Sequence, residues 1–193
     1  MVQEINMYSI IDLETTGGKY KKEGITEIAI YRFDGKNVID SFISLVNPEK
    51  TIHPFVEKLT GITQNLVKNA PRFYQIAKKI IEITEDTIIV AHNAQFDYRM
   101  IKQEFDRLGY NYNKKTLCTI EFSKTILPKI KSYKLDNLAM SLNVKISNRH
   151  RADGDALATL KIFKLLLKRD KGEKILNELI KSWKLKSIHL YNN

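Results

Sequence analysis

The stretch MYSIIDLETTGG, Met7–Gly18, decides the fold, because an apolar run ends there in two acidic residues and a Thr-Thr-Gly-Gly stop. The run Met7–Leu13 predicts a buried strand, and the two glycines predict a loop directly after it. Asp12 and Glu14 stand two residues apart, so on a strand both side chains leave the same face. Such a pair is either a solvated strand end or a place where two carboxylates share a divalent cation.

The segments that follow this stretch alternate between strand and helix patterns. Asp34-Gly35 is typical of a tight hairpin turn, and Asn93 is of a residue type that commonly caps a helix. We predict strands over Ile25–Phe33, Val38–Val46, Thr87–Val90 and Thr116–Thr119, and helices over Pro71–Ile83, Ala94–Leu108, Leu135–Leu142 and Ala156–Leu167. This order of elements predicts one α/β domain with a mixed sheet.

Length and composition agree with one packed domain. Of the 193 residues, 43% are hydrophobic and 28% are charged, a balance that excludes collagen-like and disordered classes. Cys118 is the single cysteine, which excludes an intrachain disulfide framework and a cysteine-based zinc finger. We expect the domain to cover residues 1–169, and we expect the basic tail over residues 170–193 either to dock as a helix or to fray.

The partner class follows from hydropathy and charge. No apolar run approaches the roughly 20 residues of a membrane span, and the first residues lack the pattern of a secretory signal. We therefore expect no membrane partner and a cytoplasmic location. The net charge of 32 − 22 = +10 favours a polyanion such as nucleic acid, although lysines that only solvate the surface would give the same sum.

Two further motifs carry candidate catalytic and metal-ligating groups. In HNAQFD, His92–Asp97, the carboxylate falls near a predicted helix N-terminus, where the helix dipole alone would favour it. In HRADGD, His150–Asp155, the histidine falls on a loop and the last aspartate on a helix. A loop imidazole with a reference pKa of about 6.5 can take a proton from water, and a rigid helix suits a metal ligand. Taken singly, each motif is also compatible with an ordinary surface residue.

DLETTG (Asp12–Gly17), HNAQFD and HRADGD together resemble the three motifs of the DnaQ-like exonucleases, which carry four carboxylates and a histidine (DEDDh). The proofreading epsilon subunit of bacterial DNA polymerase III belongs to this family. HPFVEKLTGIT, His53–Thr63, looks like the family's segment that contacts the 3′ end of the substrate. The resemblance implies a ribonuclease H-like α/β fold, in which helices flank a five-stranded mixed β-sheet, and metal-dependent 3′ to 5′ removal of nucleoside monophosphates.

The resemblance also implies roles for individual residues. Asp12, Glu14, Asp97 and Asp155 look like ligands of two Mg²⁺ or Mn²⁺ ions, and His150 corresponds to the general base. A sister family has a tyrosine four places before the last aspartate, where this chain has Arg151. Residues expected to bind the terminal nucleotide are Leu13, Thr15, Thr16, Leu59, Asn93 and Phe96.

Three functions remain open on these grounds. The first is a DNA exonuclease, with a DNA polymerase subunit as a further partner. The second is an exoribonuclease of the oligoribonuclease or RNase T kind, because sugar selection depends on the shape of the pocket around the 2′-hydroxyl. The third is an inactive nucleic-acid-binding module, against which the presence of all four acidic positions and the histidine argues.

Overall fold

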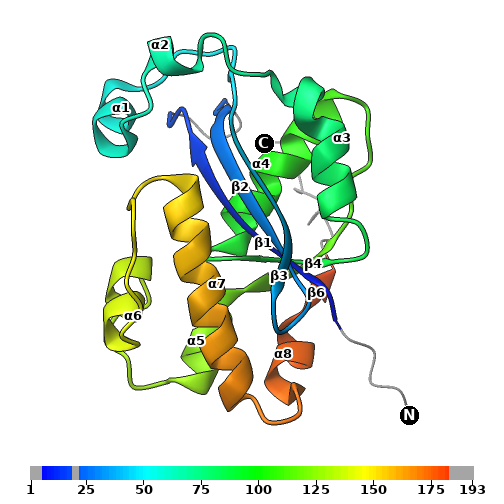
Figure 1. Ribbon diagram of the computed structural model, residues 1–193, viewed down its shortest axis with the longest axis vertical. Helices are drawn as coiled ribbons and strands as arrows, with labels where there is room; N and C mark the ends of the chain where they lie inside the picture. Colours follow the sequence, from blue (N-terminus) through cyan, green and yellow to red (C-terminus); the bar gives the residue numbers. More distant parts are fainter. Residues whose placement is uncertain (1–5, 19–21, 183–193) are drawn as a thin grey trace, which may run out of the picture.

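The computed structural model describes residues 6–18 and 22–182. Its strands are β1 Tyr8–Thr15, β2 Ile25–Phe33, β3 Val38–Leu45, β4 Ile88–Ala91, β5 Lys115–Cys118 and β6 Lys181–Ser182. Its helices are α1 Pro54–Thr60, α2 Gln64–Val67, α3 Phe73–Ile83, α4 Ala94–Arg107, α5 Thr119–Ile126, α6 Leu135–Ser141, α7 Ala152–Arg169 and α8 Lys174–Leu179. Figure 1 shows these elements along the chain.

The strands form one mixed sheet in the order β3-β2-β1-β4-β5-β6, which confirms the predicted fold class. β1 runs antiparallel to β2 and parallel to β4. The sheet is therefore antiparallel on the β2 side of β1 and parallel on the β4 side. The predicted count of five strands is wrong by one, because Lys181–Ser182 pairs antiparallel with β5. Two residues are too few to carry an alternating hydrophobic pattern, so nothing in the sequence indicates this strand.

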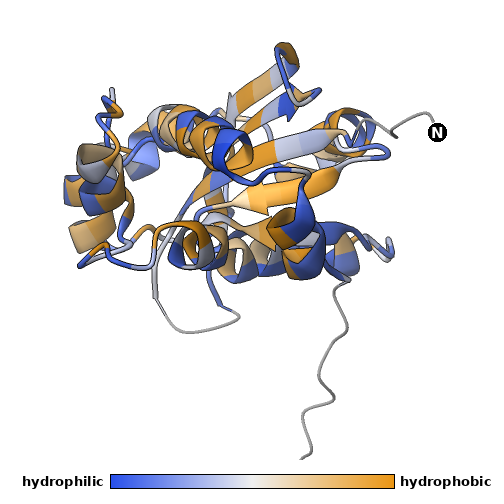
Figure 2. Ribbon diagram, turned by 90° about the horizontal axis from the view of Figure 1, so that it is seen from below, coloured by the Kyte–Doolittle hydropathy of each residue, from blue (hydrophilic) through white to orange (hydrophobic). Residues whose placement is uncertain are grey.

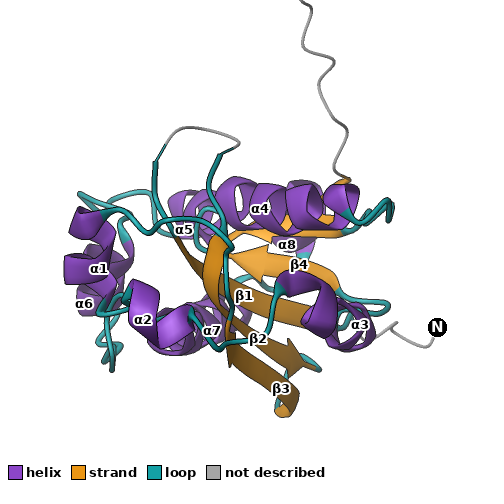
Figure 3. Ribbon diagram, turned by 90° about the horizontal axis from the view of Figure 1, so that it is seen from above, coloured by secondary structure: helices purple, strands orange, loops and turns teal. Residues whose placement is uncertain are grey.

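Helices cover both faces of the sheet. Tyr8 and Ile10 of β1 pack in a core with α5, α6, α7 and α8, whereas Ile11 and Leu13 pack in a second core with α3 and α4. Figure 3 shows α4 and α7 on opposite sides of β1, and Figure 2 shows hydrophobic residues gathered on the strands between the helices. Because neighbouring strand residues alternate between faces, Asp12 and Glu14 lie on the α7 side.

α7 is fixed to the central strands by aromatic packing. The ring of Phe163 meets the ring of Tyr8 edge to face, with 4.9 Å between the centroids. Both side chains are fully buried, and such a pair adds about 0.5–1.5 kcal/mol beyond the burial of its area. This contact holds the helix that presents Asp155 against the strand that presents Asp12.

The described part of the expected tail, residues 170–182, contains α8 and β6. The buried carboxylate of Asp170 accepts hydrogen bonds from the backbone N–H groups of Ile175 (3.3 Å) and Leu176 (2.8 Å). Leu176 is fully buried in the core that includes α7. Residues 183–193 lie outside the described residues.

Over residues 6–18 and 22–182, no helix combines the length and the apolar character needed to cross a membrane.

Candidate active site

The acidic pair of β1 meets a third carboxylate at the start of α7. Asp12, Glu14 and Asp155 each offer one oxygen atom, and these three atoms lie within 4.8 Å of one another. Period-two geometry brings the first two together, and the first turn of α7 brings Asp155, 3% exposed, over the same face. Three of the four predicted metal ligands therefore converge.

Asp97, the fourth predicted ligand, lies just outside this group. It stands in the first turn of α4, on the other side of the sheet, and its side chain is buried. The backbone N–H groups of Leu13 and of Asp97 itself hydrogen-bond its carboxylate and oppose the rise in its pKa. Its charge acts on Asp12, so the two carboxyl groups are electrostatic neighbours.

Burial and mutual repulsion disfavour ionisation of the whole group. Burial, followed by the charges of Asp97 and Asp155, raises the pKa of Asp12 well above its usual value. Burial also raises the pKa of Glu14 to about 7 and that of Asp97 to about 8. At neutral pH the acidic group therefore lacks the positive charge that would stabilise its ionised form.

The donor set fits a hard divalent cation. All ligand atoms in the group are carboxylate oxygens, the type that Mg²⁺ and Mn²⁺ prefer. Asp155 Oδ1 is buried and has no hydrogen-bond partner among the described residues. A buried acceptor without a partner is costly, and a bound cation would satisfy it.

Arg149 is a cation in direct contact with the acidic group. Its guanidinium donates from Nη1 to Asp155 Oδ2 and from Nε to Asp136 Oδ1, the latter over 2.5 Å. Its charge lowers the pKa of Asp12, Glu14 and Asp155 and so offsets part of the repulsion. The sequence motifs do not single out this residue.

His150 lies on the loop before α7, as predicted. Its backbone has a φ of 62°, in the left-handed region that few non-glycine residues adopt. The backbone N–H donates to Asp155 Oδ2 over 3.3 Å. Burial raises the pKa of Asp155, and Arg149, this hydrogen bond and the ring of His150 oppose the rise. The histidine is therefore within electrostatic reach of the acidic group.

Glu27 and Arg151 form an ion pair that sequence reasoning missed. Glu27 of β2 is 3% exposed and lies opposite Glu14 in the β1–β2 ladder. It accepts from Arg151 Nη2 (2.5 Å) and Nε (3.0 Å) and from the backbone N–H of Ala152 (2.8 Å). α7 begins at Ala152, between the histidine predicted on a loop and the aspartate predicted on a helix, and the last bond stabilises this start because Glu27 satisfies a free N–H of the first turn. The one available signal was an acidic residue inside an apolar strand.

His92 has a structural role within its motif. Its Nδ1 lies 2.9 Å from Thr119 Oγ1, and its Nε2 lies 2.9 Å from the carbonyl oxygen of Tyr133. Burial lowers its pKa to about 4, so the ring is neutral at physiological pH. The imidazole thus joins β4 to α5 and to the segment before α6.

The residues expected to bind the substrate are distributed over three elements. Leu13, Thr15 and Thr16 lie at the end of β1, and Leu13 and Thr16 are buried. The carbonyl oxygen of Thr16 accepts from the backbone N–H of His53 over 2.9 Å, which ties α1 to this strand end. Leu59 lies on α1 with 43% of its surface exposed.

Asn93 and Phe96 lie at the start of α4. The predicted side-chain cap by Asn93 is wrong, because its backbone is left-handed at φ 87° and ψ 53° and its side chain makes no capping hydrogen bond. Its side chain is exposed. Phe96 is half-buried beneath the guanidinium of Arg99, 5.4 Å from the ring centroid.

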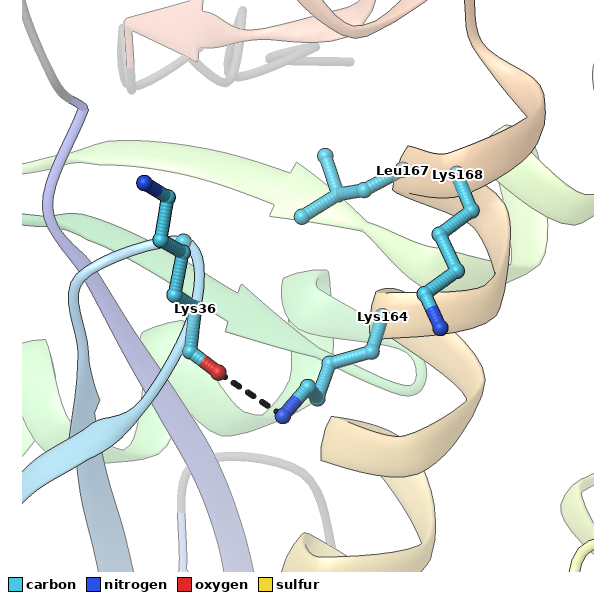
Figure 4. Close-up of a pocket in the computed structure, with 5 residues that line it drawn as sticks. Lys36, Lys164, Leu167 and Lys168 are labelled. Carbon is cyan, nitrogen blue, oxygen red and sulfur yellow. Dashed lines mark hydrogen bonds between the residues drawn. The ribbon is translucent and has the colours of Figure 1, made fainter.

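A separate cavity lies at the other end of α7. It has a volume of about 430 Å³ and is lined by Gly35, Lys36, Lys164, Leu167 and Lys168. Figure 4 shows Lys164 reaching across to the turn between β2 and β3, where its Nζ donates to the carbonyl of Lys36 over 2.8 Å. This lining contains three lysines and no carboxylate, so its charge repels a divalent cation.

The fold and the site together define a class of protein, the ribonuclease H-like nucleases with a carboxylate centre at the end of the central strand. The chain belongs to the RNase T exonuclease family, whose sequence model matches residues 9–163. The resemblance of the three motifs to the DnaQ-like exonucleases is thereby confirmed. Membership implies divalent metal ions, in agreement with the acidic group.

Two relatives are similar over most of the chain. A PolC-type DNA polymerase III of Caldanaerobacter subterraneus subsp. tengcongensis is 38% identical over 162 residues, 84% of this chain and 12% of its own length. A 3′-5′ exonuclease DinG of Staphylococcus aureus is 37% identical over 169 residues, 87% of this chain and 19% of its own length. The chain thus spans less than a fifth of either relative.

A solved structure shows the same fold at the scale of a whole domain. The nuclease domain of 3′hExo, a DEDDh family member bound to rAMP, superposes with a TM-score of 0.76 at 19% identity. The match covers 94% of this chain and 98% of that domain.

Proposed function

We propose that this chain is a metal-dependent exonuclease that removes nucleoside monophosphates from the 3′ end of DNA. The observation that carries the proposal is the convergence of oxygen atoms of Asp12, Glu14 and Asp155 within 4.8 Å, with a buried oxygen of Asp155 that has no hydrogen-bond partner in the described part of the chain. The DNA polymerase relative supports DNA as the substrate, and the 3′-5′ exonuclease relative supports removal from the 3′ end.

The three converging carboxylates and Asp97 would hold two divalent cations, Mg²⁺ or Mn²⁺. When bound, such cations activate a water molecule and stabilise the negative charge that develops on the phosphate and on the leaving 3′ oxygen. Four acidic side chains would balance the charge of two such cations, and the raised pKa values of Asp12, Glu14 and Asp97 support this assignment because a nearby cation would favour their ionised form.

His150 would act as the general base. Its imidazole takes the proton of the attacking water, and the hydrogen bond from its backbone N–H to Asp155 supports this role. Leu13, Thr15, Thr16, Leu59, Asn93 and Phe96 would contact the terminal nucleotide. Of these, Leu59 and Asn93 expose the most surface for such contact.

RNA as substrate and a DNA polymerase as partner stay predictions. The same carboxylates and histidine would hydrolyse either polymer, because the discrimination depends on contacts to the 2′-hydroxyl. The polymerase partner is supported by the PolC-type relative, of which this chain matches 12%. A cytoplasmic location also stays a prediction.

The test uses single-stranded DNA and RNA oligomers of the same sequence, labelled at the 5′ end, with Mg²⁺ or Mn²⁺. We expect a ladder of DNA products shortened from the 3′ end, with nucleoside monophosphates released, and no products with a chelator. Degradation of RNA alone would support the exoribonuclease. Binding of DNA without release of mononucleotides in either metal would support the inactive binding module.

A further inference from the structure

Glu27 is a buried acidic residue that the proposed reaction does not use. It lies on β2 among apolar residues, and burying a carboxylate is expensive unless hydrogen bonds and an opposite charge compensate. Its compensation is complete, because both oxygens accept from Arg151 and Oε2 also accepts from the backbone N–H of Ala152. With both oxygens occupied in this way, Glu27 has no oxygen left free for a metal ion.

The two residues that contact Glu27 lie between His150 and Asp155 in the chain. Arg151 directly follows His150, and Ala152 opens the helix that presents Asp155 three residues later. Glu27 therefore holds the backbone between the proposed base and a proposed ligand. Glu27 also lies opposite Glu14 in the β1–β2 ladder. The same pair of strands therefore carries the acidic residues of β1 and the residue that contacts the loop of His150.

The backbone at His150 needs such support. Its left-handed φ of 62° is uncommon for a residue with a side chain, and Asn148, two residues earlier, has a φ of 54°. Such conformations persist where the surrounding contacts determine them. On the side toward α7, these contacts include the hydrogen bond from the N–H of His150 to Asp155 and those of Arg151 and Ala152 with Glu27.

We propose that Glu27 and Arg151 are positioning residues that fix His150 relative to the carboxylates of β1. The inference rests on the proposed role of His150 as the general base. A helix cap alone would need only an acceptor for the N–H of Ala152, whereas the planar guanidinium of Arg151 engages the carboxylate through two nitrogens and so sets an orientation. A displacement of about 1 Å in a reacting group can cost about 10²-fold in rate.

The first test is kinetic and uses Glu27→Gln and Arg151→Gln, each alone and combined with His150→Ala. We expect each single variant to lower kcat by about 10- to 100-fold with KM changed less than about twofold. In the His150→Ala background neither should lower kcat further, because the group they position is gone. Arg72→Gln, which breaks the exposed pair with Glu49, is the matched control and should keep the kcat of the wild type.

Two kinetic outcomes would overturn the inference. One is a wild-type kcat in both single variants. The other is an equal loss of kcat with and without His150, which would show that the pair acts on the fold as a whole.

The second test does not depend on nuclease activity. Amide hydrogen exchange is measured on the chelated protein, and Arg151→Gln is expected to speed exchange over residues 148–152 by at least about tenfold while residues 73–83 of α3 keep their rates. Unchanged exchange over 148–152 would overturn the inference even in an active enzyme. Faster local exchange in a chain without nuclease activity would instead refute the proposed function and leave the positioning of this loop established.

Discussion

The carbonyl oxygen of Ser147 stands against the Cα of Gly154, so that a Cβ atom on Gly154 would overlap it. The carbonyl of Asn148 lies nearly as close. The loop that carries His150 thus rests directly on the first turn of α7, and it can do so because residue 154 has no side chain. The glycine of the HRADGD motif is therefore a packing requirement of the site.

Gly154→Ala is expected to push this loop away from α7. The overlap is with backbone atoms, which cannot turn aside as a side chain can, so we expect a loss of about 1–3 kcal/mol in the free energy of unfolding. The rate of nucleotide release should fall as His150 moves. Denaturant unfolding and an exonuclease assay check the two effects, and wild-type values in both would show that the loop can shift without consequence.

Asp12→Asn is expected to lower the rate of nucleotide release to that of the wild-type protein in the presence of a chelator, because the charges of Asp97, Asp155 and Glu14 all act on Asp12. The chelated variant should melt at a higher temperature, since a neutral amide relieves repulsion, by about 2–4 °C per kcal/mol relieved. Asp40→Asn, which changes an exposed carboxylate paired with Lys79, is the control and should alter neither property by as much. Retained activity in Asp12→Asn would defeat the assignment of the site.

His150→Ala is expected to lower kcat by about 10² to 10⁴-fold, the usual contribution of a general base. The affinity for Mn²⁺, measured by calorimetry, should stay near that of the wild type, because the ligands are carboxylates. A large loss of Mn²⁺ affinity would assign the histidine to the metal instead.

The stability of the chelated protein should fall as the pH rises from about 4 to about 8. Folding raises the pKa of Glu14 to about 7 and that of Asp97 to about 8, whereas unfolded carboxyl groups ionise near pH 4. Between these values the folded state binds more protons than the unfolded state, so raising the pH favours unfolding. Melting curves with a chelator check this, and saturating Mg²⁺ should reverse the trend. Stability that rises over this range would contradict the raised pKa values.

Leu59→Ala is expected to raise KM for a DNA oligomer several-fold without lowering the melting temperature, because the side chain is 43% exposed on α1. Leu108→Ala provides the matched control. Leu108 is 47% exposed and follows the C-terminus of α4, whereas Asp97 lies in the first turn of that helix. Equal KM values in both variants and the wild type would exclude Leu59 from substrate binding.

The parts of the site that could be predicted are those that obey local periodicity. Asp12 and Glu14 share a face because strand side chains alternate, and Asp97 and Asp155 fall in first helical turns that the hydrophobic spacing of α4 and α7 indicates. That these segments meet was implied by the family resemblance, since sequence spacing alone does not bring distant segments together.

The parts that could not be predicted depend on contacts between distant residues. The first turn of α7 contacts Glu27, which lies 125 positions earlier in the chain than Ala152. The backbone of Asn93 is left-handed where a side-chain cap was expected, and β6 exists only because β5 offers it an edge. No local sequence pattern indicates contacts between residues so far apart in the chain.

The pairing of Arg149 with Asp155 bears on how the protein matures. Repulsion among several carboxylates opposes folding of the chain when no divalent cation is bound. The guanidinium supplies part of the missing countercharge from within the polypeptide. We therefore expect the domain to fold before metal ions bind to it, so that synthesis and metal loading are separate steps.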